Sequence, residues 1–181
     1  MSKYFTLNEL FASATAAQQG IDNTPPADTE ARLNTLTEKL LDPVRELWDA
    51  PLTVNSGYRS PALNRAVGGA ARSQHLTGEA ADITTGSRAG NRLLFNMIVA
   101  AAGLSPPPKS PPNRPPLVIA RSAATKQSSR VDLTAANPEP LPETPPKPQL
   151  IFDQLIDERN YSWLHLSYRT GRNRQQVLHL R

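Results

Sequence analysis

Residues 73–82 read Ser73-Gln-His-Leu-Thr-Gly-Glu-Ala-Ala-Asp82 and place an imidazole and a carboxylate seven residues apart. In a continuous strand, this odd spacing would put the two side chains on opposite faces. Gly78 lies between them, and glycine adopts the backbone conformations that a sharp bend requires. A bend at Gly78 would therefore let His75 and Asp82 point toward one centre.

A second imidazole lies far downstream, in Ser162-Trp-Leu-His-Leu-Ser-Tyr168. Strand alternation places Trp163, His165 and Ser167 on one face. Together with His75 and Asp82, His165 would complete three zinc ligands and leave a fourth position open, as in catalytic zinc sites. Without a metal, the two histidines would be half-buried residues with ordinary hydrogen bonds.

His179 is the remaining histidine. It lies in a short apolar stretch close to the C-terminus, which favours a packing or surface role over metal binding.

Helix signals dominate the first half of the chain and strand signals the second. Helices are expected after Thr6 up to Gly20, over 33–47 with a kink at Pro43, after Ser60-Pro61, and from Ser87 to Gly103. Strands are expected over 51–55, 80–83, 150–156, 162–168 and 177–180. This order predicts an α+β fold with helices packed on a small, mainly antiparallel sheet.

Proline marks one interruption of this pattern. Of the 18 prolines, 13 lie in residues 105–148, a stretch without glycine or aromatic residues. Such a composition cannot bury enough surface to offset the entropy of ordering. We therefore predict a single domain over 1–104 and 150–181, with 105–149 as a proline-rich, disordered insertion. An inert insertion is favoured over a docking tract or an active-site lid.

Charge and cysteine content narrow the function classes. Residues 105–148 carry six Lys/Arg and three Asp/Glu, so the remainder holds 14 basic and 13 acidic residues. A nearly neutral domain argues against a nucleic-acid partner. The absence of cysteine excludes thiol catalysis and disulfides. No run suits a membrane span or a signal peptide, so we expect synthesis in the cytoplasm. We also expect the protein to be a monomer.

The pattern Ser73-x-His75-x-x-Gly78-x-Ala80-x-Asp82, followed by Trp163-x-His165, resembles the signature of the zinc D-Ala-D-Ala carboxypeptidase family, which has the hedgehog/DD-peptidase fold. Residues 54–61 resemble the segment that precedes the first ligand in that family. Residues 5–10 and 20–26 resemble small phage and prophage members. The similarity covers 4–104 and 150–178.

The resemblance implies one zinc ion per chain, held by His75, Asp82 and His165. It implies that Arg59 meets a substrate carboxylate or the developing oxyanion, a task that suits a bidentate guanidinium. It also implies that Ser73 forms a hydrogen bond on the substrate side. The alternatives are a surface salt bridge for Arg59 and a loop-forming role for Ser73.

The position of the general base in this sequence differs from that in part of the family. Several members carry an acid three positions before the last histidine ligand, where this chain has Ser162. Relatives of hedgehog type place a glutamate further upstream, which points to Asp157 or Glu158. Glu158 is preferred because a strand ending there could direct its carboxylate toward the metal.

The implied function is zinc-dependent hydrolysis of D-amino-acid-containing bonds in peptidoglycan stem peptides. The enzyme would be a D,D-carboxypeptidase or an endopeptidase, for instance in phage or prophage lysis, and would act at the cell wall once released. The alternative is a non-catalytic wall-binding or structural domain that keeps the fold, with or without the zinc.

Overall fold

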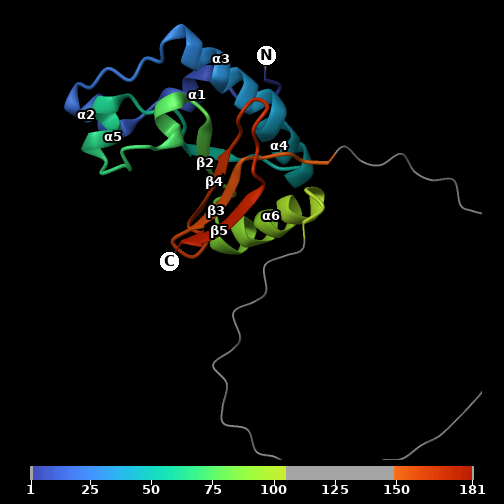
Figure 1. Cartoon of the computed structure of the whole chain (residues 1–181). Helices are drawn as coiled ribbons and strands as arrows, with labels where there is room; N and C mark the ends of the chain where they lie inside the picture. Colours follow the sequence, from blue (N-terminus) through green and yellow to red (C-terminus); the bar gives the residue numbers. More distant parts are fainter. Residues whose placement is uncertain (1, 105–148, 181) are drawn as a thin grey trace, which may run out of the picture. The chain divides into compact units, whose positions relative to one another are not determined.

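The computed structural model describes residues 2–104 and 149–180 (Figure 1). The expected insertion over 105–149 lies, apart from Gln149, outside the described residues. Helices and one five-stranded sheet make up the described part, which confirms the predicted α+β class.

The N-terminal segment forms two short helices, α1 (Leu7–Phe11) and α2 (Ala14–Gln19). The expected capping box is present, because Thr6 and Glu9 exchange backbone and side-chain hydrogen bonds. A single helix reaching Gly20 is wrong: Ala12 and Ser13 are extended, and the Ser13 side chain caps α2.

Pro43 shapes the next helical stretch. Helix α3 (Ala27–Leu36) continues into one π-helical segment, η1 (Thr37–Leu41), and then into α4 (Asp42–Trp48). Proline has no N–H and cannot complete the regular ladder. The chain widens before it, and the Asp42 N–H donates to the carbonyl of Thr37, five residues back. The predicted kink therefore takes the form of a π-turn.

Five strands form the sheet: β1 (Thr53–Ser56), β2 (Ala80–Thr84), β3 (Gln154–Glu158), β4 (Trp163–Ser167) and β5 (Gln176–Leu180). Their order is β1-β2-β4-β3-β5, with β3 and β5 parallel and the other pairs antiparallel. The mainly antiparallel sheet is thus confirmed. Strand β3 begins later than the expected Leu150, because Leu150 and Phe152 are buried in the core without joining the ladder.

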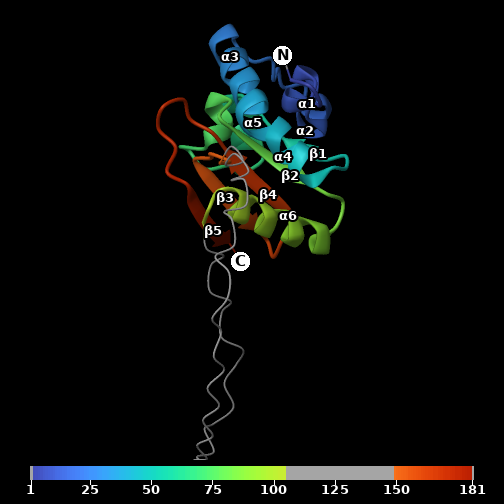
Figure 2. The same cartoon turned by 90° about the vertical axis from the view of Figure 1, so that its right-hand side faces the viewer.

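The two faces of the sheet differ in character. One face packs against α6 (Arg88–Ala101), which crosses β3 and β4 in Figure 2. This face supplies the core residues Ala81, Ile83, Leu155, Leu164 and Leu166, and the apolar side of α6 supplies Leu94, Phe95 and Ile98. The other face carries Asp82 on β2, its register partner His165 on β4, and Glu158 on β3, which pairs with Trp163 two positions from His165. The candidate ligands and Glu158 therefore lie on the same side of the sheet, opposite α6.

The two described segments that flank residues 105–148 meet beyond the end of α6. The Leu150 N–H donates to the carbonyl of Ala101 at 3.1 Å, and the Gln149 side chain donates to the carbonyl of Ala102. The chain thus returns to the point where it left. Within 2–104 and 149–180, no helix has the length and apolarity that crossing a bilayer would demand.

Candidate metal centre

Strand register brings together two candidate ligands that are 83 positions apart in the sequence. Asp82 on β2 and His165 on β4 are directly paired in the antiparallel ladder. Directly opposed residues share a face of the sheet. The Nδ1 of His165 lies 2.9 Å from the Oδ1 of Asp82. The alternation predicted for residues 163–167 is therefore confirmed.

His75 reaches the same place from a short 3-10 helix, η2 (Gln74–Thr77). Gly78 ends this helix with φ +72° and leads into β2, so it forms the expected bend. A Cβ at Gly78 would come within 2.8 Å of the Thr29 side chain. Glycine is thus required both by the backbone conformation and by the close packing of this turn against α3.

Three ligand atoms converge at this point. The Nε2 of His75 lies 3.2 Å from the Oδ1 of Asp82 and 3.2 Å from the Nδ1 of His165. Tetrahedral zinc ligands at their usual bond lengths lie about 3.3–3.5 Å from one another. The three residues are buried and are the His/Asp/Glu group of the described chain that could hold a metal ion. Their spacing and chemistry fit zinc.

The His75 ring is oriented by a backbone carbonyl. Its Nδ1 lies 2.6 Å from the carbonyl oxygen of Gly57. A carbonyl only accepts, so Nδ1 carries a proton, and in the neutral ring, which is the form that binds a metal, Nε2 presents a lone pair. In that form two acceptors, Nε2 and the Asp82 carboxylate, face each other, an arrangement that a cation stabilises. Such an outer hydrogen bond is typical of metal-bound histidines.

The Asp82 carboxylate is kept ionised. Burial acts to raise its pKa, but in the metal-free site, attraction to a protonated His75 ring and hydrogen bonds from His165 and His75 more than offset this and hold the pKa well below its usual range. An ionised carboxylate is the form that binds a metal.

Arg59 lies against this carboxylate. Its terminal nitrogen donates to the Oδ2 of Asp82 at 2.8 Å, and its Nε donates to the Ser56 hydroxyl at 2.8 Å. Its backbone N–H donates to the carbonyl of His75 at 3.1 Å. The sequence predicts a substrate-binding arginine or a surface salt bridge; the structure places Arg59 in a largely buried ion pair with a candidate ligand.

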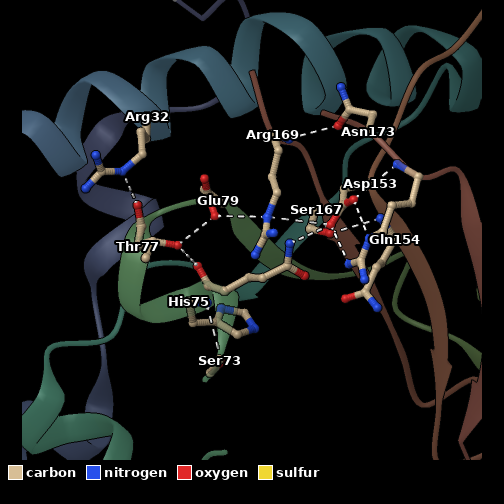
Figure 3. A network of polar contacts seen from close by, with 12 residues as sticks. Arg32, Ser73, His75, Thr77, Glu79, Asp153, Gln154, Ser167, Arg169 and Asn173 are labelled. Carbon is tan, nitrogen blue, oxygen red and sulfur yellow. Dashed lines mark hydrogen bonds and ion pairs between the residues drawn. The ribbon is translucent and has the colours of Figure 1, made fainter. Parts of the chain in front are cut away.

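Ser73 has a local role in the structure. Its hydroxyl accepts the N–H of His75 and caps η2 (Figure 3). This contact corresponds to the loop-forming alternative. The role toward substrate stays a prediction.

The two candidate bases lie on opposite faces of the sheet. Glu158 pairs with Trp163, on the same face as His165, whereas Asp157 faces α6. Asp157 accepts the backbone N–H of Tyr161 and pairs with His179 at 3.0 Å. Burial and the negative charge of Asp82 raise the pKa of Glu158, the direction that suits a general base near neutral pH. The geometry favours Glu158.

The remaining polar residues lie away from the ligand cluster. His179 packs its ring against Phe95 at a centroid distance of 5.0 Å, in line with the expected packing role. Ser162 donates its hydroxyl hydrogen to the Arg159 carbonyl. The carbonyl of Gly57 was not foreseen as a partner of His75; its only sequence signal is its place within the run 54–61.

Comparison with known proteins agrees with this geometry. Residues 3–102 match the family model described as peptidase M15, a range that contains His75 and Asp82 but not His165. Over 60 residues the chain is 45% identical to the zinc D-Ala-D-Ala carboxypeptidase of Streptomyces albus G. That stretch covers 32% of this chain and 24% of the relative, so the chain spans about a quarter of that protein's length. Because the family model covers more than half of the chain, the protein belongs to the peptidase M15 family.

Proposed function

We propose that the protein is a zinc-dependent peptidase that cleaves D-amino-acid-containing bonds in peptidoglycan stem peptides. The observation that carries this proposal is the convergence of His75, Asp82 and His165 at tetrahedral spacing, on the face of the sheet that also bears Glu158. Similarity to the zinc D-Ala-D-Ala carboxypeptidase of Streptomyces albus G supports the metal and the substrate class.

The residues divide the work of hydrolysis. His75, Asp82 and His165 would hold one zinc ion, which when bound polarises a peptide carbonyl and makes water a better nucleophile. Glu158, with its raised pKa, accepts a proton from the attacking water and donates it to the leaving amine.

Arg59 serves two partners in this proposal. One terminal nitrogen and Nε are bonded to Asp82 and Ser56. Within the described residues nothing bonds the other terminal nitrogen, which is left for a substrate carboxylate or the developing oxyanion. The guanidinium thus steadies a ligand and meets the substrate.

Removal of a terminal D-Ala is the preferred reaction, because the matched relative is named for it. Cleavage of an internal cross-bridge would use the same residues. The proposed place of action is the cell wall after release from the cell. Phage or prophage lysis is the proposed setting, supported by the resemblance of residues 5–10 and 20–26 to such members.

The test is amine release from a D-Ala-D-Ala peptide and from peptidoglycan fragments, with zinc content measured on the same sample. We expect one zinc per chain, activity that a chelator removes, and recovery when zinc is added back. Zinc at one per chain without release from any substrate would instead favour a non-catalytic wall-binding domain. Ser162, which stands where several relatives carry an acid, is the observation behind that second candidate.

A further inference from the structure

A second buried polar centre lies next to the candidate metal site. Asp153, just before β3, is fully buried. Arg174 donates to its Oδ1 through the backbone N–H at 3.1 Å and Nε at 2.7 Å, and to its Oδ2 through a terminal nitrogen at 2.7 Å. The fourth donor is the Gln74 side chain, whose Nε2 lies 2.8 Å from the Asp153 Oδ2. Figure 3 shows Asp153 within this network, in the same view as His75.

The Gln74 amide has one possible orientation. Hydrogen bonds from Arg174 and Gln74 outweigh burial and lower the pKa of Asp153, so this carboxylate only accepts. Gln74 must therefore turn Nε2 toward Asp153, and its Oε1 is left buried without a hydrogen-bond partner. A buried carbonyl without a partner costs stability. An apolar side chain of similar size would avoid this cost but would also lose the hydrogen bond to Asp153, so the amide is retained for its contact with that carboxylate.

Gln74 is also the first residue of η2, directly before His75. Its carbonyl accepts the Thr77 hydroxyl at 3.0 Å and the Glu79 N–H at 3.1 Å. On the other side of the turn, Arg32 donates to the carbonyl of Thr77 at 2.6 Å. The side-chain hydrogen bond of Gln74 to Asp153 thus connects the first residue of η2 to the segment that precedes β3.

We propose that Gln74 and Asp153 are positioning residues of the metal centre. Asp153, oriented by Arg174, holds the Gln74 amide and so sets the 3-10 helix that aims His75 at Asp82 and His165. This inference rests on the proposed metal site. It assigns to the buried pair a role in zinc affinity rather than in the contact with substrate. Loss of a hydrogen bond that orients a ligand commonly changes metal affinity 10- to 100-fold, and Gln74 acts on His75 through the backbone of η2.

The test compares two glutamine variants. Gln154 also bonds through its amide, with Nε2 2.8 Å from the Gln176 Oε1, but it has no bond to η2. Zinc affinity of the metal-free full chain is measured by competition with a chromophoric chelator, and thermal unfolding is recorded in EDTA. We expect Gln74→Met to weaken zinc binding at least tenfold and Gln154→Met to change it less than twofold.

Arg174→Met tests whether the orientation of Asp153 by Arg174 contributes to the position of Gln74. Arg174 is half-exposed, but its loss removes two side-chain donors from the buried Asp153, so the thermal unfolding of this variant in EDTA is recorded beside its zinc affinity. We expect a threefold or greater loss of zinc affinity in the wild-type background and no further loss in the Gln74→Met background. If Gln74→Met does not fold, the proposal is tested by Arg174→Met alone. Unchanged zinc affinity in Arg174→Met then overturns the proposal.

Other outcomes separate this inference from the proposed function. A wild-type chain that binds zinc, with Gln74→Met equal to it, overturns the positioning role alone. Equal losses in Gln74→Met and Gln154→Met also overturn it, because they indicate general loosening of the sheet. A wild-type chain that binds no zinc overturns the metal site and this inference together.

Discussion

Arg59 and Asp82 form an ion pair of 2.8 Å through the carboxylate oxygen that the histidines leave free. The other oxygen, Oδ1, faces both His75 and His165. One carboxylate is thus held from two sides, and its rotation is restricted before any metal binds. A side chain expected to serve the substrate is therefore also a support for a ligand.

Removing the Arg59 guanidinium should weaken zinc binding. We expect Arg59→Met to lower zinc affinity about tenfold, because Asp82 loses the partner that orients it. Arg59→Lys should lose less. Chelator competition measures the affinity, with Arg172→Met, at an exposed arginine, as the control. Unchanged affinity with a raised KM would restrict Arg59 to substrate binding.

The three histidines should separate into two classes. His75→Ala and His165→Ala should leave the purified chain without stoichiometric zinc and without activity, since each removes one of three ligands. His179→Ala should retain both, because His179 pairs with Asp157 on the α6 side of the sheet. Elemental analysis gives the zinc content. Equal loss of zinc in all three variants would show that the ligands are wrongly assigned.

Glu158→Gln should separate catalysis from metal binding. We expect kcat to fall about 100-fold or more, because amide nitrogen cannot accept the proton, while zinc content stays at one per chain. Asp157→Asn is the matched control: it should lower the melting temperature, because Asp157 is buried and bonded to Tyr161 and His179, with a far smaller effect on kcat. The reverse ranking of the two kcat values would make Asp157 the base.

The decrease of kcat/KM at acidic pH should report the protonation of Glu158. Glu158 must be ionised to accept a proton, and its pKa is raised above the ordinary value. Activity, as kcat/KM, should therefore fall as the pH drops through this raised pKa, at a higher pH than for an exposed glutamate. Zinc content is followed across the same range, so that metal loss is not mistaken for protonation.

Gly78 and Gly68 form a matched pair for testing the ligand turn. Both have positive φ, near +70°, but only Gly78 has neighbours in the way of a Cβ. We expect Gly68→Ala to destabilise the fold by about 1 kcal/mol and Gly78→Ala by about 2–3 kcal/mol. Only Gly78→Ala should also weaken zinc binding. Chemical denaturation and zinc titration measure the two effects, and equal destabilisation would argue against the close contact with Thr29.

Residues 105–148 should be dispensable for the domain. Because Leu150 bonds to Ala101 and Gln149 to Ala102, a short Gly/Ser linker can join Leu104 to Gln149. By loop-closure scaling, this shortening should change stability by at most about 2 kcal/mol. We expect cooperative unfolding and one zinc per chain after the deletion. Loss of the cooperative transition would mean that the segment belongs to the core.

Local patterns predicted how the candidate ligands His75, Asp82 and His165 converge. Alternation along 163–167 predicts the face of His165, and Gly78 predicts the bend between His75 and Asp82. The 3-10 helix was missed, because four residues show no periodicity. The start of β3 was misplaced because Leu150 and Phe152 are apolar through core burial, and hydrophobicity does not distinguish core contact from strand pairing.

Contacts between distant residues could not be predicted in this way. Gln74 and Asp153 are 79 positions apart, and no local sequence pattern around either residue predicts their hydrogen bond. The parallel pairing of β3 with β5 likewise depends on how the chain crosses the sheet. The same holds for Arg59, whose pairing with Asp82 follows from the position of β1 beside β2.

Metal supply and folding are coupled by the origin of the ligands. His75 and Asp82 precede residues 105–148 in the sequence, and His165 follows them. A bound ion would therefore cross-link the two parts of the chain. An ion that binds only the folded form adds about 2.7 kcal/mol at 100 times its dissociation constant. Resistance of this domain to heat and to proteases should therefore follow the free zinc concentration of its surroundings.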